Sequence, residues 1–205
     1  MPRNPSLSLL GLTLIFASTV VPSLAQSAST AHAYSPEYTK DGHLLLPQNY
    51  REWVFLTSGL GMSYGPKTAG MDHVMFDNVF VNPEAYRSFV ETGTWPDKTV
   101  LVLEIRGAES KRSINKSGHY QGTDKMGMEV HIKDSAHFPD KWAFFDFGSD
   151  KGDLIPPSAT CYSCHAEHAA VDTTFVQFYP TLLPIAQKKA TFSPAYLKEM
   201  AAPAN

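Results

Sequence analysis

The residues Cys161-Tyr162-Ser163-Cys164-His165 constrain this chain more than any other feature of its sequence. Two cysteines separated by two residues and followed at once by histidine form the attachment signature of c-type haem. In such a site the two thiols bond to the porphyrin vinyl groups and the adjacent imidazole binds the iron. Because positions three and four apart share one side of a helix, a single turn can present all three side chains to one porphyrin edge. The motif predicts one covalent haem c, with His165 as the iron ligand.

The same two cysteines have three alternative interpretations: a disulfide, a thioredoxin-type redox pair, or half of a zinc site. Cys161 and Cys164 are the chain's two cysteines, so a zinc site would need further nitrogen or oxygen ligands at suitable spacing. A thioredoxin-type pair belongs near the start of a βαβ unit, whereas this motif comes late, after Pro156 and Pro157. The haem interpretation accounts for all residues of the motif.

The N-terminal sequence indicates export from the cytoplasm. Arg3 precedes an apolar run from Leu7 to Val21, and Ser23-Leu24-Ala25 forms a small-x-small cleavage site. The run is shorter than an ordinary membrane span. We expect residues 1–25 to be a cleaved signal peptide, with an uncleaved anchor as the alternative, and the mature protein to be periplasmic and free of the membrane. Haem attachment in bacteria takes place outside the cytoplasm, so the two predictions agree.

The composition predicts one folded domain and excludes some partners. The chain has 17 Lys and Arg against 20 Asp and Glu, a formal net charge of −3 at pH 7. It has no basic run, so neither nucleic acid nor an anionic membrane surface is an expected partner. A positively charged redox partner protein is compatible with this balance. We expect a flexible N-terminal segment at 26–43, the haem domain at 44–190 and a C-terminal tail at 191–205.

The hydrophobic pattern predicts strands first and a haem helix late. A short helix is expected from Asn49 to Leu56, and a second helix from Pro83 to Gly93. Strands are expected in segments rich in β-branched and aromatic residues, namely 74–81, 99–105, 120–121, 126–132 and 142–147. Residues 148–160 form an expected polar connection, and Pro180 can open a final helix through Ala186. This order predicts an α+β fold with a C-terminal haem-binding turn or helix.

Several further stretches, in matching order, resemble the cytochrome P-460 family, which includes the cytochrome c′-beta proteins. Besides the haem motif they are residues 44–54, 78–86, 127–130, 133–135, 138–139, 142–145 and 175–180. The resemblance implies a dimeric, mainly antiparallel β protein with some helices and one five-coordinate haem, whose distal side is an open pocket. Members that oxidise hydroxylamine carry a lysine bonded to the porphyrin. Cytochrome c′-beta members lack this bond and bind nitric oxide.

The resemblance also assigns distal residues one at a time. The family's proton-removing glutamate falls on Glu129, within Gly127-Met128-Glu129-Val130. The cross-linking lysine falls on Leu103, and a distal arginine of the hydroxylamine-oxidising type falls near Asp77. Leucine has no nucleophile and aspartate has the opposite charge, so the resemblance disfavours hydroxylamine oxidation in this chain.

The residues themselves predict an apolar distal wall. If Leu103 faces the haem, strand alternation sends Leu101 and Ile105 the same way. Phe76 and Asp77 lie on opposite faces of their strand, so one of them faces the iron, and we expect Phe76 to join Leu103 in the wall. Such a wall offers no hydrogen bond and favours small neutral ligands.

Glu129 has two interpretations. On a solvated face it is an ordinary polar side chain of a strand. Buried beside a haem, its pKa would rise, and it could then relay protons near neutral pH.

We therefore expect an exported mono-haem c-type cytochrome whose five-coordinate iron binds nitric oxide or a similar small nitrogenous ligand. Whether the chain is an enzyme stays open. One alternative is a hydroxylamine-oxidising enzyme that uses another lysine, such as Lys98, Lys125 or Lys133. The other is a six-coordinate electron carrier whose second iron ligand is one of His73, His119, His131, His137, His168, Met126 and Met128.

Overall fold

The computed structural model describes Met1, residues 34–63 and residues 74–202. Most of the predicted signal peptide and the candidate ligand His73 lie outside the described residues. Within the described part of the chain, no helix is both long enough and apolar enough to cross a membrane.

The described residues form one seven-stranded antiparallel sheet with four α-helices and two short 3₁₀ helices. The strands are β1 (Leu44–Leu45), β2 (Val54–Leu60), β3 (Met75–Val81), β4 (Val100–Glu109), β5 (Tyr120–Lys133), β6 (Trp142–Asp146) and β7 (Lys151–Leu154). The helices are η1 (Tyr50–Glu52), α1 (Pro83–Thr92), α2 (Thr160–His168), η2 (Val176–Phe178), α3 (Leu183–Lys189) and α4 (Pro194–Ala201). The strands lie in the order β1-β7-β6-β5-β4-β3-β2. The predicted α+β fold with a mainly antiparallel sheet is confirmed.

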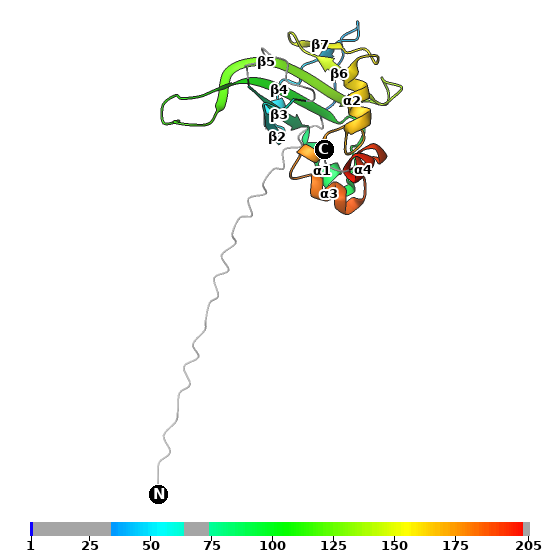
Figure 1. Cartoon of the computed structure of the whole chain (residues 1–205). Helices are drawn as coiled ribbons and strands as arrows, with labels where there is room; N and C mark the ends of the chain where they lie inside the picture. The colour runs from blue at the N-terminus through cyan, green and yellow to red at the C-terminus, as the bar shows by residue number, and fades with distance from the viewer. Residues whose placement is uncertain (2–33, 64–73, 203–205) are drawn as a thin grey trace. The chain divides into compact units, whose positions relative to one another are not determined.

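The sheet separates two hydrophobic clusters, one on each face. Val100 and Val102 of β4 belong to one cluster, while Leu101 between them belongs to the other. This is the arrangement expected for a strand of continuous aliphatic residues buried on both faces. Helices α1, α3 and α4 gather at one end of the sheet, and α2 lies beside β6 (Figure 1). The site described below lies on the face that carries Leu101.

Helix α1 shows how local signals fix an element. Pro83 occupies its first turn, where a missing backbone N–H costs nothing. Gly93 ends it in the left-handed region, with φ of 78°, and its N–H donates to the carbonyl of Phe89 at 2.7 Å. A Cβ at Gly93 would lie 2.7 Å from that of Lys189, so both backbone shape and space require glycine there.

Two local predictions were wrong because tertiary pairing overrode the local pattern. The helix expected from Asn49 to Leu56 is limited to the 3₁₀ turn η1, and Val54–Leu60 instead forms β2, which pairs with β3 along the sheet edge. Its β-branched and aromatic residues suit that pairing. The polar connection expected at 148–160 contains β7, which pairs with β6 and β1. Helix α4 lies within residues 191–205, and it contacts α2.

A buried carboxylate anchors the sheet face opposite the site. The Glu104 side chain is 1 % exposed and forms ion pairs with Arg51 and with Arg106, whose Nε lies 2.6 Å from Oε1. Tyr50 also donates its hydroxyl to this carboxylate. Burial opposes ionisation, but the hydrogen bonds from Arg106 and Tyr50 and the arginine charges outweigh it and lower the pKa of Glu104.

Glu104→Ala should lower the free energy of unfolding by about 3–5 kcal/mol, because it leaves the largely buried Arg106 without its counter-ion. Glu109→Ala on the same strand is the control, since that exposed carboxylate should contribute less than about 1 kcal/mol. Urea denaturation of both holoproteins measures the difference. Equal losses would contradict a special role for Glu104.

Candidate functional site

One face of the sheet forms the floor of a cavity of about 350 Å³. The residues of the floor come mainly from five neighbouring strands and are Thr57, Gly59, Met62, Met75, Asp77, Val79, Leu101, Leu103, Ile105, Glu129, Val130, His131 and Phe144. Helix α2 and the segment that follows it form the opposite wall with His165, Thr174, Phe175, Phe178 and Tyr179. Most of these side chains are apolar. The cavity can therefore enclose a largely hydrophobic group between the sheet and the C-terminal helices.

The strand register decides which predicted distal residues reach this cavity. Leu101, Leu103 and Ile105 all line it, as alternation along β4 requires. On β3 the lining residues are Met75, Asp77 and Val79, so the neighbouring Phe76 points to the other face of the strand. A carboxylate, rather than the expected aromatic ring, thus belongs to the floor.

Two carboxylates lie in this mainly apolar floor. Burial raises the pKa of Asp77 above its ordinary value. Burial also raises the pKa of Glu129, and the negative charges of Asp146 and Asp77 raise it further. Asp146 is the cross-strand partner of Glu129. The floor therefore holds two groups that retain protons more strongly than exposed carboxylates do.

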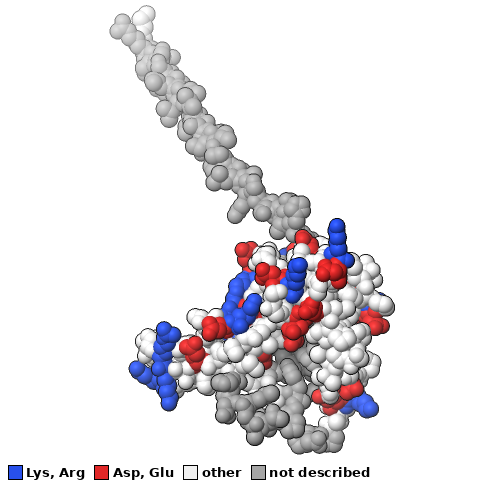
Figure 2. All heavy atoms as spheres, turned by 90° about the horizontal axis from the view of Figure 1, so that it is seen from above, with Lys and Arg blue, Asp and Glu red and all other residues white. Residues whose placement is uncertain are grey.

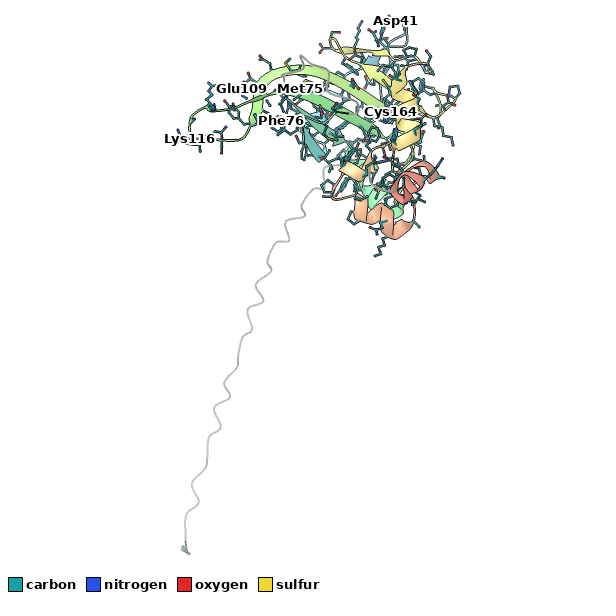
Figure 3. All side chains as sticks on the ribbon, in the orientation of Figure 1. Asp41, Met75, Phe76, Glu109, Lys116 and Cys164 are labelled. Carbon is teal, nitrogen blue, oxygen red and sulfur yellow. The ribbon has the colours of Figure 1, made fainter. Side chains whose placement is uncertain are left out.

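Helix α2 carries the whole cysteine motif at one end of the cavity. Neither Cys161 nor Cys164 is in a disulfide, and both are partly exposed. Figure 3 shows Cys164 on this helix, beside the end of the sheet. Tyr162, between the cysteines, fixes the helix to the sheet by donating its hydroxyl to the carbonyl of Ile155 at 3.1 Å. Both cysteines are thus free thiols on the helix that contributes His165 to the cavity.

Of the two ring nitrogens of His165, Nδ1 is hydrogen-bonded to the described part of the protein and Nε2 is not. Its Nδ1 lies 2.7 Å from the carbonyl oxygen of Thr173. A carbonyl can only accept, so Nδ1 carries the proton and Nε2 keeps its lone pair. Burial lowers the pKa of His165, which keeps the imidazole neutral. Its ring packs against Phe175 and Phe144, with ring centroids 4.2 and 4.6 Å away. A neutral imidazole with a free Nε2 is a metal ligand.

A sequence model of the cytochrome P460 family matches residues 47–176, which contain the cavity floor and the cysteine motif. The chain belongs to the cytochrome P460 family. The predicted resemblance is thereby confirmed, and membership implies a c-type haem protein. A comparison with curated proteins gives no significant match. The residues present fit a haem, since a mainly apolar cavity is lined by a neutral imidazole from the helix that also carries two free thiols.

Of the second-ligand candidates named from the sequence, His131 alone among the described residues lines the cavity; Met62 and Met75, which were not among those candidates, line it as well. Its ring contacts that of His165 edge to face, with centroids 5.1 Å apart at 76°, so no porphyrin layer fits between them. The other described candidates lie elsewhere: His137 pairs with Asp134, His168 pairs with Glu199, Met128 is buried in the cluster on the other face, and His119 and Met126 are exposed.

The lysines proposed for a porphyrin bond also lie away from the cavity lining. Lys98 pairs with Asp134, and Lys133 pairs with Asp172 at 3.3 Å. Lys125 is exposed on β5. Among the residues that the structure describes, no lysine lines the cavity.

Sequence reasoning missed two parts of this site. Thr173 acts through its backbone carbonyl, which leaves no signature in a sequence. His131 was one of many candidate histidines, and the signal that could have placed it is its spacing of two from Glu129, since residues two apart share a strand face. A cavity position for Glu129 therefore implies one for His131.

Glu129→Gln should change the pH dependence of stability. The ordinary carboxyl pKa is 4.5 and the folded value is raised, so the folded state binds the proton more tightly than the unfolded chain. The free energy of unfolding therefore falls as the pH rises from about 4.5 through the folded pKa. Glutamine does not titrate, so the variant does not lose this stability. The free energy of unfolding of the variant minus that of wild type should therefore be larger at pH 7 than at pH 4. Urea denaturation at both values measures it, with Glu109→Gln as the exposed control. Parallel profiles would contradict a raised pKa.

Proposed function

We propose that this protein is an exported mono-haem c-type cytochrome that binds nitric oxide, or a similar small nitrogenous molecule, at its iron. Cys161 and Cys164 hold the porphyrin, and His165 is the proximal ligand. One observation carries the proposal: the imidazole of His165, whose Nδ1 is hydrogen-bonded to the carbonyl of Thr173, enters a cavity lined mainly by apolar side chains. The bound haem would supply an iron with one open coordination position.

The floor residues support a small uncharged ligand. Leu101, Leu103 and Ile105 exclude water and offer no hydrogen bond. Asp77 and Glu129 repel a negatively charged molecule such as nitrite whenever they are ionised. Nitric oxide, which is neutral and needs no hydrogen bond, fits both protonation states.

Hydroxylamine oxidation is the second candidate, and the two carboxylates favour it. A reaction that removes protons from hydroxylamine needs an acceptor, and a carboxylate with a raised pKa is a stronger proton acceptor than an ordinary carboxylate. Glu129 and Asp77 both line the cavity with this property. Leu103 counts against this candidate, because leucine cannot form the porphyrin bond of the hydroxylamine-oxidising members.

The proposal includes a periplasmic location, a homodimer and a redox partner protein. Strand β2 is an edge of the sheet, and its Phe55 and Leu60 are exposed. An unpaired edge with exposed apolar side chains supports contact with a second copy. On the face shown in Figure 2, acidic and basic side chains are interspersed, which supports a protein partner better than a nucleic acid.

Covalent attachment should be visible in the mass of the purified holoprotein. Wild type should carry the mass of one haem that acidified acetone cannot extract, because thioether bonds survive this treatment. The double variant Cys161→Ser, Cys164→Ser should lose it, while Ser163→Ala, between the two cysteines, should keep it. A double variant that retains haem after extraction would exclude attachment through these thiols.

The rate of nitric oxide binding should depend on the side chains of the cavity floor. The ferrous protein should give a high-spin five-coordinate spectrum that changes on addition of nitric oxide, and hydroxylamine with an electron acceptor should give no sustained turnover. Leu103→Phe should slow nitric oxide association by filling the floor, whereas Phe76→Leu, on the other face of β3, should not. A low-spin resting spectrum would instead support the six-coordinate electron carrier, and sustained turnover would support the hydroxylamine oxidase.

A further inference from the structure

A tight turn formed by residues 171–174 faces helix α2. Val171 and Thr174 exchange two backbone hydrogen bonds, at 2.9 and 3.3 Å. Between them, Asp172 adopts the left-handed region with φ of 52°, which an aspartate tolerates better than most residues. This conformation presents the carbonyl of Thr173 to His165. The position of the axial imidazole therefore depends on the position of this turn.

Side chains from the sheet side hold the turn one residue at a time. Lys133 Nζ lies 3.3 Å from Oδ2 of Asp172. Trp95 donates its indole N–H to the hydroxyl of Thr174 at 2.7 Å. A hydrogen bond of 3.1 Å joins Nε2 of His131 to the hydroxyl of Thr173. Each contact fixes a different residue, and the one from His131 reaches the residue whose carbonyl binds His165.

The ring of His131 is itself immobilised. It stacks on Phe144 with centroids 3.9 Å apart and an angle of 10°, and it packs against Trp142 at 4.4 Å. His131 as a whole is 8 % exposed to solvent. A ring fixed between two aromatic side chains is a rigid point from which a hydrogen bond can position a neighbouring group.

We propose that His131 is a positioning residue for the axial imidazole and that it acts through Thr173. The hydroxyl of Thr173 binds His131 while its carbonyl accepts the Nδ1–H of His165, so one residue links the two histidines. The inference rests on the proposed role of His165 as the iron ligand. In this proposal a residue of β5, on the floor of the cavity, determines the position of the imidazole on the proximal side of the metal.

The proposed link has a consequence for the metal. A strong hydrogen bond from Nδ1–H to a carbonyl increases the electron donation of the imidazole, which favours the ferric over the ferrous state. Loss of the link lets the turn move and weakens that hydrogen bond. The midpoint potential should then rise, and the iron–histidine stretching frequency of the ferrous protein should fall.

Thr173→Val tests the link with the least disturbance, because valine keeps the branched shape and the backbone carbonyl but lacks the hydroxyl. Thr173→Ser keeps the hydroxyl and is the matched control. His131→Phe keeps an aromatic ring in the stack and removes the other partner. Potentiometry and resonance Raman spectroscopy of the covalent holoproteins provide readouts that are independent of turnover.

Thr173→Val and His131→Phe should both raise the potential and lower the iron–histidine frequency, and Thr173→Ser should resemble wild type. The double variant should shift the potential and the frequency no further than either single variant does, because both substitutions remove the same hydrogen bond. An unchanged potential and frequency in Thr173→Val would overturn the inference, even if His131→Phe does not fold. A wild-type protein without an iron–histidine band would instead refute the proposed axial role of His165.

Discussion

The hydrogen bond from Nδ1 of His165 to the carbonyl of Thr173 determines the chemistry that this fold can support. It selects the tautomer with a free Nε2, and burial among aromatic rings keeps that imidazole neutral. The carbonyl belongs to a turn that side chains from the sheet side fix in place. The orientation of a residue on α2 is therefore set by β5, which comes some thirty positions earlier in the chain.

The distal side depends on strand register in the same way. Cross-strand pairing puts Leu103 opposite Val79 on one side and Glu129 on the other, so these three lie in one row of the floor. The adjacent row contains Asp77, Ile105 and the small Gly127. A slip of one residue would exchange this face for the opposite one, which carries the buried Glu104. The Glu104 ion pairs on that face thus help to keep the carboxylates of the floor where they are.

The sequence predicted elements whose signals are local and left open those that depend on pairing. Helix α1 has a proline at its start and a glycine at its end, and β4 is a continuous aliphatic run, so both were predicted correctly. Strand β2 was mistaken for a helix because its apolar residues also fit a helical stripe, and only its partner β3 decides the matter. Whether Phe76 or Asp77 lines the cavity depends on the register of the sheet. The role of Thr173 depends on its backbone carbonyl. Neither could be settled from residue types.

Leu103 and Glu129 together bear on the choice between the two candidate functions. The two residues are direct cross-strand partners, so the position that the family resemblance assigns to a cross-linking amine lies beside the position it assigns to a proton acceptor. Here the acceptor is present and the amine is replaced by a hydrocarbon side chain. A second carboxylate, Asp77, lines the same cavity but supplies no amine. The proposed binding of a neutral ligand rests on this pairing, because a hydrocarbon side chain at the position of the amine cannot form the porphyrin bond of the hydroxylamine-oxidising members.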